Sequence, residues 1–263
     1  MVLYEQQLKT QDAVQKEHWK RAWESYRQQE TGEHDSTEGV IKKLIENGML
    51  SGQRVLDIGG GAGRYAIPFS EYAQDVTVTD ISPRALAYAR RYAEKKGCQN
   101  IQYVVLDWDK INISTLGWDR YFDFVFASMC PAVRSRKGID NMSAVSKGWC
   151  QINQLIYMED TIFEKVKMQF PVQPGYDPHN DRAALQAFFN ILWEQQFDPE
   201  VTYLHQSGCQ SVSVDEVIPY YLRRLQENVS EQELRQFLTG YSEEGHLSVH
   251  QNTILSMIRW KVS

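Results

Sequence analysis

Three acidic residues stand where buried strands are expected to end. Asp57 lies at the end of the apolar run RVLDI, Asp80 closes VTVTD, and Asp107 follows IQYVVL. Because the carboxyl ends of parallel strands meet at one edge of a sheet, we expect these side chains to lie near one another. Carboxylates accept hydrogen bonds from hydroxyl and amino groups, and they repel phosphates. The pattern indicates a site for a small molecule that carries positive charge.

A run of glycines follows the first of these strands directly. Gly59, Gly60, Gly61 and Gly63 stand between the strand and the next helix, where a ligand can approach the backbone without meeting a Cβ. A dinucleotide site requires the spacing G-x-G-x-x-G, and here its last position is Arg64. The run alone is also compatible with a structural turn. Together with the acids at successive strand ends, it favours a ligand other than a pyrophosphate.

The second acid supports a nucleoside at this edge. Asp80 follows the glycine run by about 20 residues, the place of a carboxylate that accepts hydrogen bonds from two free ribose hydroxyls. Asp107 can accept a hydrogen bond from an adenine amino group, and Ile81 and Trp108 offer apolar faces to the ring. A core or surface position for Trp108 is the alternative.

Strands and helices alternate along most of the chain. Strands are expected at 54–58, 75–79, 101–106, 122–127, 147–158, 200–205 and 253–262. Helices are expected at 36–47, 64–72, 83–96, 185–195, 214–226 and 231–239. The alternation predicts a Rossmann-like, doubly wound α/β fold, whose seven-stranded, mostly parallel sheet carries helices on both faces.

The N-terminal region is expected to form a helical cap on the same domain. Trp19, Trp23 and Tyr26 share one face of a helix, which serves either to cover a ligand or to pack an amphipathic helix on the domain. We therefore expect a cap over 1–50 and a ligand-binding domain over 51–263.

Composition is that of a globular protein, with 42% hydrophobic and 24% charged residues in a chain of 263. The net charge of −6 argues against a nucleic-acid partner, although Arg134, Arg136 and Lys137 form a small basic patch. There is no apolar run of membrane-spanning length and no signal peptide, so we expect a cytoplasmic location. The four cysteines match no zinc spacing, and they are expected to be reduced.

These segments together resemble the class I methyltransferases that use S-adenosylmethionine. VLDIGGGAGRYA resembles their motif I, VTVTDIS their motif II, and LDWD the acidic segment that contacts adenine. FDFVFASMCPAV resembles the segment around strand four, after which the loop faces the cofactor and the substrate. HWKRAWESYRQQ is similar to the helix that closes over the cofactor in many small-molecule members.

The resemblance implies an enzyme that transfers a methyl group from S-adenosylmethionine to a small-molecule acceptor. It places the cofactor against the three acids and the glycines, with Ile81, Trp108, Ser128, Trp19 and Tyr26 around it. An RNA or protein methyltransferase, or a non-catalytic protein that binds S-adenosylmethionine, is the alternative. The acceptor and the oligomeric state are left open.

No side chain is assigned to catalysis and no metal is predicted. The sulfonium is a good leaving group, so positioning can supply much of the rate, and a base is needed only for a protonated acceptor. Cys130 in the loop after strand four is expected to be a packing residue. His246 and His250 would suit a metal if they shared a helix face, but the residues between them favour a loop or strand.

Overall fold

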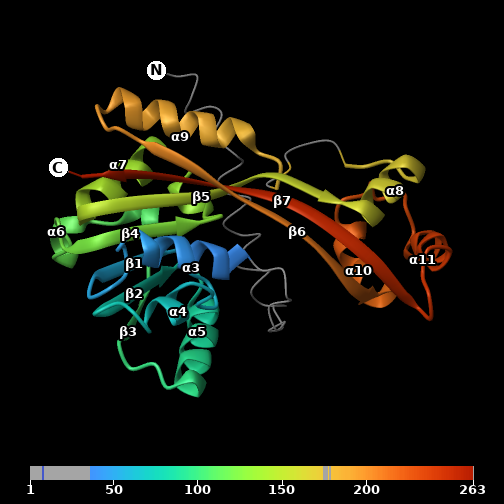
Figure 1. The fold of residues 1–263 in the computed structure, drawn as a ribbon, viewed down its shortest axis with the longest axis horizontal. Coiled ribbons are helices and arrows are strands. Elements are labelled where there is room, and N and C mark those ends of the chain that lie inside the picture. The colour runs from blue at the N-terminus through green and yellow to red at the C-terminus, as the bar shows by residue number, and fades with distance from the viewer. Residues whose placement is uncertain (1–7, 9–35, 174–176, 178, 263) are drawn as a thin grey trace. The chain divides into compact units, whose positions relative to one another are not determined.

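The structure is a computed structural model that describes residue 8, residues 36–173, residue 177 and residues 179–262 (Figure 1). The chain divides into two compact units. Unit 1 holds the described residues up to Gln154, Arg182–Leu204, and those from Leu255 onward. Unit 2 holds the described residues of Leu155–Asp181 together with His205–Ile254. The expected cap lies largely outside the described residues, so the division into 1–50 and 51–263 stays a prediction.

The described elements follow the expected alternation. The strands are β1 (Arg54–Ile58), β2 (Asp75–Asp80), β3 (Ile101–Val105), β4 (Phe122–Ser128), β5 (Ser146–Asp160), β6 (Glu200–Ser213) and β7 (His246–Lys261). The α-helices are α3 (Ser36–Glu46), α4 (Ala66–Phe69), α5 (Pro83–Lys96), α6 (Ile113–Leu116), α7 (Arg136–Val145), α8 (Thr161–Gln169), α9 (Arg182–Glu194), α10 (Val214–Leu222) and α11 (Glu231–Thr239). Two short 3-10 turns are η1 (Trp108–Lys110) and η2 (Pro131–Val133). Within the described chain, no helix is both long and apolar enough to cross a membrane.

The strands form one seven-stranded sheet in the order β3-β2-β1-β4-β5-β7-β6. The pairs β3–β2, β2–β1, β1–β4 and β4–β5 are all parallel. The chain winds from β1 toward β3 on one side, and it returns to β4 and β5 on the other. The strand order therefore reverses between β1 and β4, and the carboxyl edge at such a point is where open α/β sheets bind ligands. The expected Rossmann-like fold is confirmed.

The two faces of the sheet in unit 1 are covered by different helices. Leu56 and Val125 face a core that includes residues of α7 and α9. On the opposite face Phe126 meets two aromatic rings at the start and end of α4, with centroid distances of 4.8 Å to Tyr65 and 5.2 Å to Phe69. Both faces of β4 are therefore packed, which explains why its sequence is a nearly continuous apolar run.

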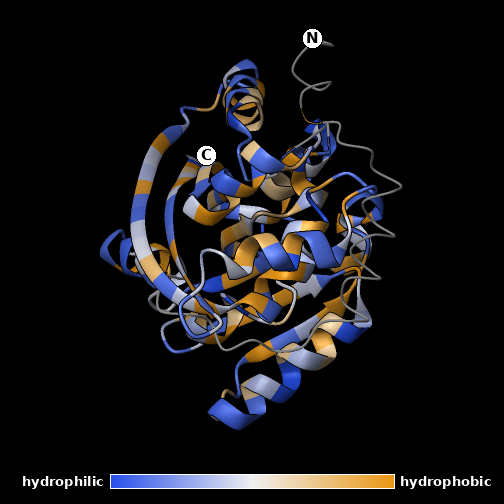
Figure 2. Cartoon of the chain, turned by 90° about the vertical axis from the view of Figure 1, so that its right-hand side faces the viewer, coloured by the Kyte–Doolittle hydropathy of each residue, from blue (hydrophilic) through white to orange (hydrophobic). Residues whose placement is uncertain are grey.

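Helix α5 shows how local sequence sets the ends of an element. Ser82 caps it by accepting a hydrogen bond from the N–H of Ala85 at 3.2 Å, and Pro83 occupies the first helical position. Gly97, with φ 76°, ends it in the left-handed conformation. Figure 2 shows this helix as the lowest element, with hydrophobic residues interrupting a hydrophilic surface, as expected for a helix that buries one side.

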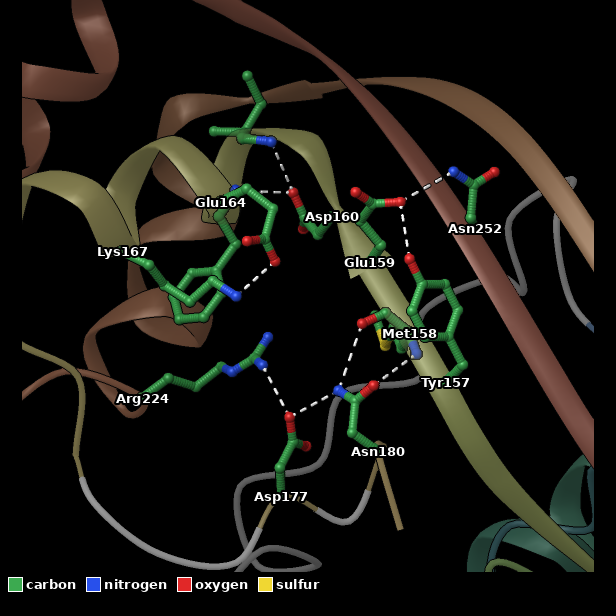
Figure 3. Close-up of polar contacts among 12 residues, drawn as sticks. Tyr157, Met158, Glu159, Asp160, Glu164, Lys167, Asp177, Asn180, Arg224 and Asn252 are labelled. Carbon is green, nitrogen blue, oxygen red and sulfur yellow. Dashed lines mark hydrogen bonds and ion pairs between the residues drawn. The ribbon is translucent and has the colours of Figure 1, made fainter. Parts of the chain in front are cut away.

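Unit 2 has its own core and a polar network beside it (Figure 3). Asp160 is 4% exposed and begins α8 by accepting hydrogen bonds from the N–H groups of Ile162 and Phe163. The Arg224 guanidinium lies 3.9 Å from the centre of the Phe163 ring and pairs with Asp177 at 3.3 Å. These charges are satisfied within the unit, so we interpret the network as structural.

Several expected boundaries are wrong. The helix expected over 64–72 is regular only over Ala66–Phe69, because the turn at Gly63 delays its start and Pro68 donates no N–H. The expected strands 200–205 and 253–262 are each longer, since β6 and β7 include polar residues that face outward in alternation. Helix α10 stops at Leu222, short of the expected 226.

Candidate cofactor site

The glycine run forms a tight loop at the carboxyl end of β1, and it leaves no room for side chains. Gly59 has φ 66°, and a Cβ on it would lie 2.4 Å from the Cys130 Sγ. A Cβ on Gly60 would lie 2.5 Å from the Asp57 Oδ2 and 2.4 Å from a methyl group of Val78. The loop is therefore packed directly on the ends of β1 and β2, which holds backbone groups at the edge where a ligand binds. Gly61 and Gly63 belong to the same loop and are also left-handed.

Asp57 is a buried carboxylate at the end of β1, with 1% exposure. The pKa of Asp57 is raised from 3.8 to about 7, first by burial and then by the charge of Asp80, against the effect of a hydrogen bond from the Ala66 backbone. Its Oδ2 atom is buried and has no hydrogen-bond partner in the described chain. An unsatisfied buried acid is costly, so this oxygen indicates a place for a donor or a cation.

Asp80 ties the end of β2 to the glycine loop. Its Oδ2 accepts a hydrogen bond from the N–H of Gly61 at 3.1 Å, and its Oδ1 accepts one from the N–H of Ser82 at 2.8 Å. Burial raises the pKa of Asp80, and the backbone hydrogen bonds from Ser82, Gly61 and Ile81 act against it. Each carboxylate oxygen can accept more than one hydrogen bond, so capacity remains for two ligand hydroxyls.

The acidic segment after β3 gives weaker evidence of a ligand contact than Asp57 and Asp80 do. Asp107 pairs with the exposed Lys110 at 3.2 Å, a contact of the kind that contributes little in water. Trp108 is 2% exposed in the core of unit 1, and its indole N–H donates to the Gly138 carbonyl at 3.0 Å. Packing accounts for Trp108 fully, so the structure favours the core alternative, and the adenine contact stays a prediction.

The loop after β4 lies beside the glycine loop. The Ser128 hydroxyl is 3.3 Å from the hydroxyl of Tyr65, which follows the glycines. Cys130 is buried, and burial raises its pKa to about 12, so its thiol is not activated as a nucleophile. This agrees with the packing role expected for it.

Other expected residues lie outside this site or outside the description. Trp19 and Tyr26 fall outside the described residues, so their role stays a prediction. His246 and His250 lie on β7, as the strand interpretation expects. No three potential metal ligands come together in the part of the chain that is described.

Two residues of this region were not expected. No role was predicted for Tyr65, although it stands just after the glycine run. An aromatic residue at this position can reach the end of β4. Asn153 of β5 is fully buried, and its significance depends on pairing with a distant strand. The only local signal is a group of three amides, Gln151, Asn153 and Gln154, close together in one strand.

The fold is the Rossmann-like fold found in methyltransferases of known structure. Residues 55–147 match the model of a methyltransferase domain family. The structure of the YcgJ protein from Bacillus subtilis is similar, with TM-score 0.55, 18% identity, and coverage of 85% of this chain and 98% of that one. Magnesium protoporphyrin IX methyltransferase from Synechocystis PCC 6803, with bound SAH, gives TM-score 0.50 at 15% identity and 94% coverage of each chain.

The relatives found by sequence match a smaller part of this chain than the solved structures do. A ubiquinone biosynthesis O-methyltransferase from Methylocella silvestris is 41% identical over 64 residues, which are 24% of this chain and 25% of that protein. The uncharacterized methyltransferase YcgJ of Bacillus subtilis is 32% identical over 80 residues, 30% of this chain and 31% of its own length. The chain thus spans between a quarter and a third of the length of these two relatives.

Proposed function

We propose that the protein transfers a methyl group from S-adenosylmethionine to a small-molecule acceptor by in-line displacement. The observation that carries this proposal is the buried pair Asp57 and Asp80 around the glycine loop, with one Asp57 oxygen unpartnered. S-adenosylmethionine is a nucleoside with a positive sulfonium and an ammonium group. A pyrophosphate would bring two more negative charges to the same acids.

The residues of the site fit this cofactor in kind. Asp80 would accept hydrogen bonds from the ribose hydroxyls while it keeps those from Gly61 and Ser82. Asp57 would face the positive end, and Asp107 would accept from the adenine amino group once released from Lys110. Ile81, at the end of β2, is half-buried and offers an apolar surface.

The cofactor supplies an activated methyl group on its sulfonium. The chain supplies position, because the glycine loop and the two acids restrict where the ligand can lie. When ionised, the buried acids also supply negative charge at a fixed place. No side chain is assigned as a general base, since a base is needed only for an acceptor that arrives protonated.

A small acceptor is supported by the relative that acts in ubiquinone biosynthesis. That support concerns a match of 64 residues, which is 24% of this chain. The acceptor's identity and its reacting atom are therefore not part of the proposal.

Calorimetric titration tests the cofactor. The wild-type protein should bind S-adenosylmethionine and should not bind NAD. Asp80→Ala should weaken binding by about 1.5–3 kcal/mol, because it removes hydrogen bonds to a charged group. Asp119→Ala, which removes an exposed acid from unit 1, is the control and should leave binding unchanged. Binding of NAD without S-adenosylmethionine would overturn the proposal.

A further inference from the structure

Helix α5 concentrates positive charge on a chain whose net charge is negative. It holds five of the 28 lysines and arginines and one of the 34 acids. Arg84, Tyr88, Arg91 and Lys95 follow one another at helical spacing, so they form one basic stripe along the helix. The three cations of this stripe are exposed. The net charge of −6, which argues against a nucleic-acid partner for the chain as a whole, therefore does not describe this surface.

Tyr88 holds two guanidinium groups of the basic stripe close together. The Arg91 guanidinium lies 4.6 Å from the centre of the Tyr88 ring, and that of Arg84 lies 6.0 Å from it. The Tyr88 hydroxyl accepts hydrogen bonds from Arg84 and Arg91, and the bond from Arg84 is the main cause of a lowered pKa of Tyr88. Among the ion pairs between described residues, none involves Arg84, Arg91 or Lys95. Two like charges held side by side without a carboxylate attract an anion that accepts hydrogen bonds from both.

An open groove lies between α5 and β3, the strand at one edge of the sheet. Its volume is about 390 Å³, and its lining includes Arg90 and Glu94 of α5 and Tyr103 of β3. The Arg90 guanidinium lies 5.1 Å from the centre of the Tyr103 ring. Nucleobases stack both on aromatic rings and on guanidinium planes, and a carboxylate such as that of Glu94 can accept a hydrogen bond from a base amino group. The groove therefore offers a stacking surface for a base next to the basic stripe.

We propose that α5 and β3 bind a single-stranded nucleic acid, with its phosphates along the basic stripe and one base in the groove. This inference goes beyond the proposed function and does not depend on it, because the nucleic acid is a docking partner and not the methyl acceptor. From Arg84 to Lys95 the stripe spans about 16 Å at the rise of an α-helix, which is room for several phosphates. Arginine suits this role because its planar guanidinium donates two hydrogen bonds to the oxygens of one phosphate.

A single strand fits this surface better than a lipid membrane or an acidic protein does. A helix that lies on a membrane inserts its apolar face, whereas Leu86, Ala89 and Ala93 of α5 are buried within unit 1. None of the large hydrophobic residues exposed in the described chain belongs to α5. An acidic protein would pair with the cations, but it would make no use of the stacking surface formed by Arg90 and Tyr103. The bases of a duplex are already stacked on one another, so a single strand is the form whose base can enter the groove.

Fluorescence anisotropy with a labelled oligouridylate of about 12 nucleotides tests the phosphate contacts. The wild-type protein should bind this probe, and the double variant Arg84→Gln/Arg91→Gln should bind it about tenfold more weakly at about 50 mM salt, since glutamine favours the helix but removes two charges. The slope of log affinity against log salt should become shallower by about 1.4, because each lost phosphate contact of a single strand contributes about 0.7. Lys165→Gln/Lys167→Gln is the matched control. It removes two cations from α8 and should leave the affinity and the slope unchanged.

Substitutions of Tyr103 test the place of the base. Tyr103→Leu should weaken binding about fivefold or more, the cost of losing one stacked base, whereas Tyr103→Phe keeps the ring and should bind as the wild type does. The inference is overturned if the wild type does not bind the oligonucleotide, if the arginine variant binds as its control does, or if the two Tyr103 variants bind equally. Binding to vesicles of phosphatidylserine and phosphatidylcholine in place of the oligonucleotide would also overturn it. S-adenosylmethionine affinity is measured separately, so the proposed function and this inference can fail independently.

Discussion

The Asp57 carboxyl group makes the protein less stable as pH rises, and the size of this effect can be worked out. The pKa of the carboxyl is about 7 in the folded chain and 3.8 as its ordinary value. The folded state therefore holds a proton between these two values that the unfolded state has lost. Each pH unit in that window changes the free energy of unfolding by about 1.4 kcal/mol.

The sign follows from which state binds the proton. Because the folded-state pKa is raised, the stabilisation by protonated Asp57 is complete below the unfolded value, and it is lost as pH approaches 7. Between pH 5 and pH 8 the wild-type protein should lose about 3 kcal/mol from this group. Asp57→Asn removes the titration and keeps the shape, so its stability relative to the wild type should rise with pH over the same range.

Urea unfolding at pH 5, 6, 7 and 8, without ligand, measures this difference. Asp119→Asn, on the surface of unit 1, is the control for removing one acid and should show no such trend. A difference between wild type and Asp57→Asn that stays constant with pH would refute the reasoning. It would mean that the carboxyl is ionised throughout, with a partner that the described chain does not provide.

Three further outcomes are expected. Gly60→Ala should destabilise the protein by about 1–3 kcal/mol in urea and weaken S-adenosylmethionine binding, because its Cβ would overlap the Asp57 carboxylate; unchanged binding would contradict this. Iodoacetamide at pH 8 should label the exposed Cys209 much faster than the buried Cys130 in peptide mapping, and equal rates would show that the loop after β4 opens readily. Tyr221→Phe should cost about 1.5–3 kcal/mol in urea unfolding, since the Tyr221 hydroxyl donates to buried Asp160 at 2.9 Å. No loss of stability there would show that the hydrogen bond contributes nothing.

The central strands and α5 could be predicted because their signals are local. β1 is an apolar run bounded by glycines and occupies the expected residues, and Ser82-Pro83 marks the start of α5. β6 was predicted too short, because its second half contains glutamine, serine and glycine with no apolar run. Its strand conformation depends on pairing with β7 within the sheet, and single-sequence patterns do not record that pairing.

Some residues of the candidate site could be predicted from the sequence, and others could not. Asp57 and Asp80 follow from their place at strand ends. The buried state of Trp108 does not, because an aromatic residue after a strand is equally compatible with a ligand contact and with the core. The unpartnered Nδ2 of Asn153 could not have been predicted from the sequence. It results from the orientation of the Gln151 side chain and from the register between β5 and β4. Both are properties of the folded sheet.

The sign of the ligand's charge decides between cofactors more strongly than the number of glycines. Two charges about 5 Å apart interact by roughly 3 kcal/mol at an effective dielectric constant of 20. A pyrophosphate at the glycine loop would meet repulsion of that order from both Asp57 and Asp80, whereas a sulfonium or an ammonium would gain a similar amount. Because Asp57 carries its own proton below about pH 7, this preference for a cation should strengthen as pH rises through that value. Asp57, which destabilises the ligand-free protein at high pH, is then also the residue that makes the site selective for a cation.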